Sequence, residues 1–211
     1  MKIINVAAAA TALTAALVLT ACGGGEPVGS AAPANPVPAP TSAAAPGPTI
    51  SAEHNQADIA FAQGMIPHHQ QAVEMSKPAT DRAGSDDIRR LATEIEQAQG
   101  PEIAKMQAFL TAWGAPAPGA MPGMDHGSMR GMDHGGMAGM VTPDQMNRIE
   151  QANGADFDRM FLDMMIAHHD GAVQMAQTEL ANGTNPEAKA LARQIVDTQE
   201  TEITEMRELL G

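Results

Sequence analysis

Apolar positions recur at spacings of one, three and four residues in two stretches of the chain, 58–110 and 158–210. A shift of 100 residues aligns these stretches without a gap, and 17 of the 53 aligned positions are identical. Because the identities follow helical spacing, both stretches keep one helix face in common while the other faces differ. The pattern therefore predicts an internal repeat that is built from helices.

Each copy of the repeat divides into two helices around a short break. The breaks, 77–87 and 181–186, contain proline and glycine. Ser85 and Asn185 are good residues for capping the helices that follow, and Gly100-Pro101 is expected to kink the second helix of the first copy. Two such hairpins (repeats 54–113 and 154–211), joined by a long connection at 115–142, predict an all-α four-helix bundle over 51–211.

Histidines and methionines lie on the helix face that the two copies share. At about 100° per residue, His69 and Met65 fall near the middle of the apolar stripe, while His68 and Met75 lie together on one flank. Pseudo-two-fold symmetry then brings the sets from both copies toward each other: Met65, His68, His69, Met75, Met165, His168, His169 and Met175. A single inward histidine is more often a hydrogen-bonded core residue, but two histidine pairs, each with methionines before and after it on the same helix face, favour a metal site. Thioethers with imidazoles suit copper, with Cu(I) favoured and Cu(II) as the alternative.

Polar residues interrupt the apolar stripe of the second helices. Gln99 and Gln199 fall inside it, and Glu102 and Glu202 lie at its edge. A buried polar group without a hydrogen bond costs about 1–3 kcal/mol. We therefore expect these four side chains to bond the histidines and to orient the imidazole rings around the metal.

The connection between the hairpins is rich in glycine, methionine and histidine. A glycine-rich stretch cannot bury these side chains in a core, and several thioethers at flexible spacing can capture a soft metal. The candidate ligands in this tract are Met121, Met124, His126, Met129, Met132, His134, Met137 and Met140. The alternative is a compositionally biased loop without a role.

The N-terminal segment indicates export. Lys2 precedes an apolar run from Ile3 to Leu19, which predicts a signal peptide over 1–21. The Leu-Thr-Ala-Cys ending resembles a bacterial lipobox, which implies a lipid anchor at Cys22, and the Ala/Pro-rich segment 22–50 is expected to be a disordered tether. We expect the mature protein on the extracytoplasmic side, in the periplasm or at the cell surface. The formal net charge of −13 and the lack of a basic run argue against nucleic acid and favour metal ions as partners.

The repeated pattern Met-Ile-x-His-His-x-x-Ala-Val-x-Met, followed by Gln-x-x-Glu-Ile-x-x-Met, resembles a bacterial family of domains of unknown function, number 305. The resemblance covers about residues 54–211. It implies a ferritin-like four-helix bundle and, for some members, exported copper-binding proteins of copper tolerance that bind metal through these methionines and histidines.

These observations leave three hypotheses for function. The first is an extracytoplasmic copper-binding lipoprotein that sequesters or hands on copper without catalysis. The second is an envelope interaction module whose histidines are structural, and the third is a metal-dependent oxidase. Di-iron oxidases of this fold need Glu-x-x-His motifs, whereas Met65 and Met165 stand three residues before His68 and His168. The sequence therefore predicts a protein that is not an enzyme.

Overall fold

The computed structural model describes residues 50–119 and 138–211, and all of its regular elements are helices. In chain order they are α1 (Gln56–Ser76), α2 (Ala79–Arg82), α3 (Asp86–Ala112), α4 (Pro143–Gln151), α5 (Gly154–Asn182) and α6 (Pro186–Leu210). The signal peptide, Cys22, nearly all of the tether and the Met/His tract before Ala138 lie outside the described residues.

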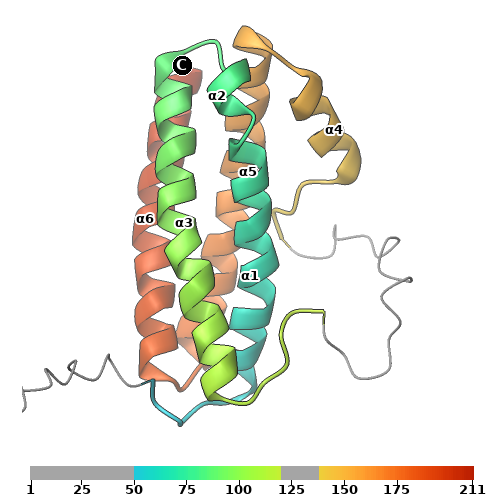
Figure 1. Cartoon of the computed structure of the whole chain (residues 1–211). Helices are drawn as coiled ribbons and strands as arrows, with labels where there is room; N and C mark the ends of the chain where they lie inside the picture. The colour runs from blue at the N-terminus through green and yellow to red at the C-terminus, as the bar shows by residue number, and fades with distance from the viewer. Residues whose placement is uncertain (1–49, 120–137) are drawn as a thin grey trace, which may run out of the picture. The chain divides into compact units, whose positions relative to one another are not determined.

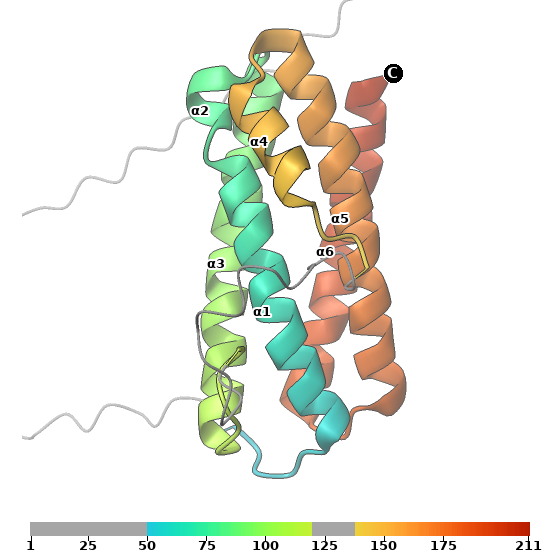
Figure 2. The same cartoon turned by 90° about the vertical axis from the view of Figure 1, so that its right-hand side faces the viewer.

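The four long helices form a bundle of two antiparallel hairpins (Figures 1 and 2). Helix α1 packs on α3 in the first hairpin and α5 packs on α6 in the second, while α1 and α5 pack on each other between the hairpins. The predicted all-α, ferritin-like four-helix bundle is confirmed. None of the helices in the described ranges has the length and apolar character needed to span a bilayer.

The helices begin at capping residues whose side chains accept backbone N–H groups. Asn55 and the third residue of α1, Asp58, form a reciprocal capping box. Ser85 accepts from Ile88 at the start of α3, and Asn185 accepts from Ala188 at the start of α6. The predicted starts of α3 and α6 are therefore confirmed. Helix α3 continues through Pro101.

The short helix α4 was not predicted from the sequence. It begins at Pro143 behind a capping box formed by Thr142 and Gln145, and Ile149 is its one buried residue. At nine residues, it is shorter than the window of about 11–18 residues over which helical periodicity is recognised. Figure 2 shows α4 lying over the line along which α1 and α5 meet.

A pair of aspartates joins the two hairpins to each other. Asp58 on α1 accepts hydrogen bonds from the backbone of Thr184 and Asn185, in the turn between α5 and α6. At the other end of the bundle, Asp158 on α5 accepts from the backbone of Gly84, just before α3. Each hairpin thus binds the turn of the other, which explains why aspartate stands at the same position in both copies of the repeat.

A layer of polar residues divides the core of the bundle into two apolar clusters. On α1, the residues before His68 belong to one cluster and those from Ala72 onward belong mainly to the other, and on α5 the two histidines separate the clusters in the same way. On α3 and α6 the boundary falls at Gln99–Glu102 and at 199–202. The polar residues that the sequence places inside apolar stripes therefore meet at one level of the bundle.

Candidate metal centre

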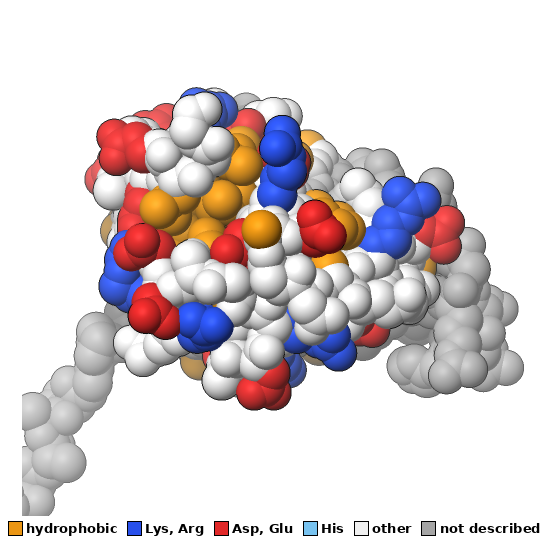
Figure 3. Space-filling model, turned by 90° about the horizontal axis from the view of Figure 1, so that it is seen from above, with side chains coloured by type: hydrophobic (Ala, Val, Ile, Leu, Met, Phe, Trp, Pro, Cys, Tyr) orange, Lys and Arg blue, Asp and Glu red, His pale blue; other side chains and the backbone are white. Residues whose placement is uncertain are grey.

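Two histidine rings from different hairpins lie in close, tilted contact at the middle of the bundle. The ring centroids of His68 and His168 lie 3.7 Å apart, with an interplanar angle of 38°. Both side chains are fully buried, as are their neighbours His69 and His169. The antiparallel crossing of α1 and α5 places these four imidazoles at one level, and Figure 3 shows no histidine on the described surface at the upper end of the bundle. The structure thus brings the predicted histidines together in the interior.

The outer two of these four histidines, His69 and His169, are each paired with a glutamate from the second helix of the same hairpin, whereas His68 and His168 are the inner two. His69 Nε2 donates to Glu102 Oε2 at 2.8 Å, and His169 donates to Glu202 in the same way at 2.7 Å. Because a carboxylate only accepts, Nε2 of each ring carries a proton, and Nδ1 is the ring nitrogen left for another partner. These Nδ1 atoms have no hydrogen-bond partner among the described residues. A histidine that donates one ring N–H to a carboxylate and presents its other nitrogen is the usual arrangement of a metal ligand.

The inner histidines differ in their partners. His68 Nε2 donates to the backbone carbonyl of Ala138 at 3.1 Å, and its Nδ1 is unpartnered within the described residues. Neither ring nitrogen of His168 has a partner there. Buried polar atoms without hydrogen bonds are uncommon in folded proteins and call for an explanation. The unpartnered nitrogens fit a site whose remaining partner is a metal ion.

The burial of the inner histidines also sets their protonation state. Burial, reinforced by the neighbouring His69, lowers the pKa of His68 to about 4. Burial and the adjacent His68 lower the pKa of His168 well below its usual value. Both rings are therefore neutral at neutral pH, which is the form that binds metals.

Three of the four predicted bundle methionines are fully buried on either side of this histidine layer. Met165 and Met75 belong to one apolar cluster, and Met65 belongs to the other. Met175 is half-buried and packs against the cluster that contains Met65. Met65 and Met165 lie about one helical turn before their histidines along the chain, one in each cluster.

The donors of this layer are nitrogen and sulfur atoms. No group of three or more histidine, aspartate, glutamate or cysteine side chains within 50–119 and 138–211 has a metal-binding arrangement, and this finding includes the four histidines. Imidazoles with thioethers about one helical turn away along the chain are few, soft donors, and such donors suit copper.

The four polar residues of α3 and α6 divide into two kinds. Glu102 and Glu202 bond histidines as described, and Glu102 also accepts from Gln194 of α6 at 3.2 Å. Within the described residues, Gln99 and Gln199 make no hydrogen bond to a histidine, and neither the amide nitrogen nor the oxygen of Gln99 has a partner there. The histidine N–H groups go to the carboxylates because an ionised acceptor binds them more strongly than an amide oxygen. The expected contact of the glutamines with the imidazoles was therefore wrong.

The end of the Met/His tract covers this centre, a feature that the sequence did not indicate. Ala138 reaches His68 because the 138–139 backbone lies directly against α5. A Cβ on Gly171 would collide with the Ala138 carbonyl, and one on Gly139 would collide with the backbone of Ala167 and His168. Gly139 also has a φ of +81°, in the left-handed region that glycine adopts without strain. Of the ligands predicted in the tract, Met140 is the one within the described residues, and it lies half-buried beside this contact.

Several solved structures resemble this chain. A DUF305 protein of Streptomyces coelicolor is 38% identical, with a TM-score of 0.64 over 73% of this chain and 91% of that one. CopM in its Cu(II)-bound form is 33% identical, with a TM-score of 0.60 over 72% of this chain and 94% of that one. CopM has also been solved with Cu(I), with silver and in the apo form. An uncharacterized protein of Acanthamoeba polyphaga mimivirus is 42% identical over 53 residues, so the match spans 25% of this chain and 35% of that protein.

The sequence profile of the domain of unknown function DUF305 matches residues 58–210, which include both copies of the repeat and the whole buried histidine layer. The chain therefore belongs to the DUF305 family.

Proposed function

We propose that this protein binds copper outside the cytoplasm and sequesters it or passes it on, without catalytic turnover. The observation that carries the proposal is the buried layer of four neutral or carboxylate-paired imidazoles whose Nδ1 atoms have no described protein partner. Histidines that served only to fill the core would use both of their ring nitrogens, because an unpaired buried polar atom costs about 1–3 kcal/mol.

The donor types support copper over other metals. The centre holds imidazole nitrogens, Met65 and Met165 stand about one helical turn from these histidines along the chain, and the carboxylates there already accept from His69 and His169. Neutral, soft donors favour Cu(I), while the imidazole pair also accommodates Cu(II). The metal-bound forms of CopM, a relative with the same fold, support this assignment.

The proposed location rests on the N-terminal segment. The charged start, the apolar run 3–19 and the Leu-Thr-Ala-Cys sequence support export, and Cys22 would carry a lipid anchor that holds the domain at a membrane surface. Mass spectrometry of the protein from its native envelope tests the anchor, because acylation at Cys22 adds a diacylglyceryl mass that a Cys22→Ala variant lacks.

The central experiment is a Cu(I) titration of the mature protein against a competing chelator. We expect His68→Asn and His168→Asn to remove the tightest binding step while the far-ultraviolet circular dichroism stays unchanged. The matched control is His54→Asn, because His54 stacks on Trp113 away from the histidine layer. Unchanged Cu(I) affinity and stoichiometry in both core variants would refute the bundle site and favour the interaction-module hypothesis.

A further inference from the structure

Three of the four buried histidines have an acceptor for the proton on Nε2. The two outer histidines donate to glutamate carboxylates, whereas His68 donates to the backbone carbonyl of Ala138. The Nδ1 atoms of all three rings have no partner within the described residues. The chain segment 138–141 therefore does for His68 what a glutamate side chain does for each outer histidine.

The segment 138–141 is held by contacts from both α1 and α5. On α1, the amide of the half-buried Gln71 donates to the Val141 carbonyl at 2.9 Å and accepts from the Val141 N–H at 2.7 Å. On α5, a Cβ on Gly171 would collide with the Ala138 carbonyl, so glycine is needed there for the segment to lie this close. The acceptor of His68 is thus placed by residues at the same position of the two repeats.

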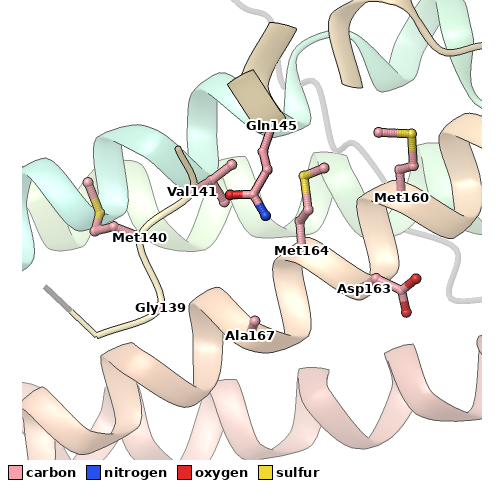
Figure 4. Close-up of a pocket in the computed structure, with 8 residues that line it drawn as sticks. All are labelled: Gly139, Met140, Val141, Gln145, Met160, Asp163, Met164 and Ala167. Carbon is pink, nitrogen blue, oxygen red and sulfur yellow. The ribbon is translucent and has the colours of Figure 1, made fainter. Parts of the chain in front are cut away.

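The segment crosses from α5 to α1 beside an open pocket. Figure 4 shows Gly139 next to Ala167 of α5 and Val141 on the side of α1, and the segment lines a pocket of about 330 Å³. The Val141 side chain is buried in the core, whereas Ala138 is exposed. The Val141 side chain therefore anchors the segment, and Gln71 fixes the direction of its backbone through both polar groups of Val141.

The acceptor at Ala138 decides which ring nitrogen of His68 carries the proton. Burial lowers the pKa of His68 to about 4, so the ring is neutral at neutral pH and has one proton. A carbonyl oxygen only accepts, so this proton is on Nε2 while Ala138 is in place, and Nδ1 keeps its lone pair. Without the acceptor, the proton can occupy either nitrogen, and a ring protonated at Nδ1 cannot bind a metal through that atom.

We propose that Gln71 is a positioning residue for His68. By holding Val141, it keeps the Ala138 carbonyl at Nε2 and leaves Nδ1 as the nitrogen for another partner. The tautomer is a property of the metal-free protein; its importance for copper binding rests on the proposed function.

The test is the ring tautomer of His68 in the full mature chain, free of metal and labelled with ¹⁵N. Long-range ¹H–¹⁵N spectra distinguish a protonated ring nitrogen from an unprotonated one. Gln71→Leu removes both hydrogen bonds to Val141 at a similar side-chain size. We expect the ratio of the Nδ1–H form to the Nε2–H form of His68 to rise about 2–10-fold, which is the effect of losing one ordinary hydrogen bond. Gly171→Ala, which displaces Ala138 from the other helix, should shift this ratio in the same direction.

The matched control is Gln70→Leu, because Gln70 is the exposed neighbour of Gln71 on α1. This variant should keep the wild-type tautomer of His68. Hydrogen exchange of the Val141 amide, in the same samples, reports whether the contact with Gln71 has opened. An unchanged tautomer in Gln71→Leu would overturn the proposal, whether or not the Val141 amide exchanges faster. A changed tautomer with the Val141 amide still protected would also overturn it, because the effect would not pass through the segment.

Cu(I) titrations of the same variants separate this proposal from the proposed function. We expect Gln71→Leu to weaken Cu(I) binding about 10-fold, as the loss of an outer partner of a metal ligand does, and Gln70→Leu to leave it unchanged. A shifted tautomer in Gln71→Leu, in a protein whose wild type binds no Cu(I), would support the positioning role and refute the proposed function. Wild-type Cu(I) binding with an unshifted tautomer in Gln71→Leu would refute the positioning role and leave the proposed function standing.

Discussion

Gly171 offers a direct test of how the histidine layer is covered. It lies in the interior of α5, and a methyl group at this position would collide with the Ala138 carbonyl that accepts from His68. The equivalent position in the first repeat is Gln71, whose amide donates to the Val141 carbonyl at 2.9 Å and accepts from the Val141 N–H at 2.7 Å. The same position of the repeat therefore contacts the segment around 138–141 in both hairpins. Gly171 does so by a close approach, and Gln71 does so by a pair of hydrogen bonds.

The expected effect of Gly171→Ala has two opposing parts. In a helix interior, alanine is more favourable than glycine by about 0.5–1 kcal/mol. Displacement of Ala138 leaves the buried His68 N–H unpaired, which costs about 1–3 kcal/mol. The midpoints of the two ranges give a net loss of about 1 kcal/mol in the free energy of unfolding, or about 2–4 °C in Tm for a domain of this size.

Urea and thermal unfolding followed by circular dichroism measure this change. Gln174→Ala, at an exposed position of the same helix, is the control and should change stability by no more than about 0.5 kcal/mol. Gln71→Ala should destabilise in the same direction as Gly171→Ala. Since both changes release one segment, the double variant should lose less than the sum of the two.

The sign of the stability change in Gly171→Ala tests whether the 138–139 segment rests on α5. A Gly171→Ala variant more stable than the wild type would mean that helix propensity acts alone, and the 138–139 segment would not rest on α5. Strict additivity with Gln71→Ala would likewise show that the two positions hold different structures.

Three further predictions concern ionisable groups. Burial and the nearby Asp58 carboxylate, opposed by the charge of Lys189, raise the pKa of Glu179 to about 8. The protonated form of Glu179 therefore stabilises the fold fully below the ordinary pKa of 4.5, and this stabilisation is lost as the pH rises through 8. Glu179→Gln should flatten the dependence of stability on pH between those two values, as measured by urea titrations. Asp58→Asn weakens the bonds from the α5–α6 turn and should lower the free energy of unfolding by about 1.5–3 kcal/mol, and an unchanged urea midpoint would contradict it. Glu202→Gln removes the charged acceptor of His169 and should weaken Cu(I) binding about 10–100-fold in chelator competition without changing the fold.

Local patterns in the sequence were sufficient to predict the four long helices and their inward faces. The period of 3.6 residues places Met65, His69 and their counterparts toward the core whatever the crossing angle of the helices. Ser85 and Asn185 act on backbone groups within three residues, so their capping roles are also local. The break residues and the repeat itself follow from the same short-range information.

Contacts between distant segments were decided by the tertiary structure. The ring contact between His68 and His168 requires the antiparallel crossing of α1 and α5 at these residues, and a helical wheel does not contain this crossing. The choice of Glu102 over Gln99 as the partner of His69 depends on which side chain reaches the ring and carries charge. The Ala138 carbonyl is a backbone acceptor that every residue has, so the sequence does not indicate that it faces His68. Gly171 and Gly139 permit a close approach of two segments, but a glycine does not identify the segment that approaches it. For this reason the types of donor and the candidate partners on α3 and α6 could be inferred from the chain alone, whereas the partner that each imidazole binds could not.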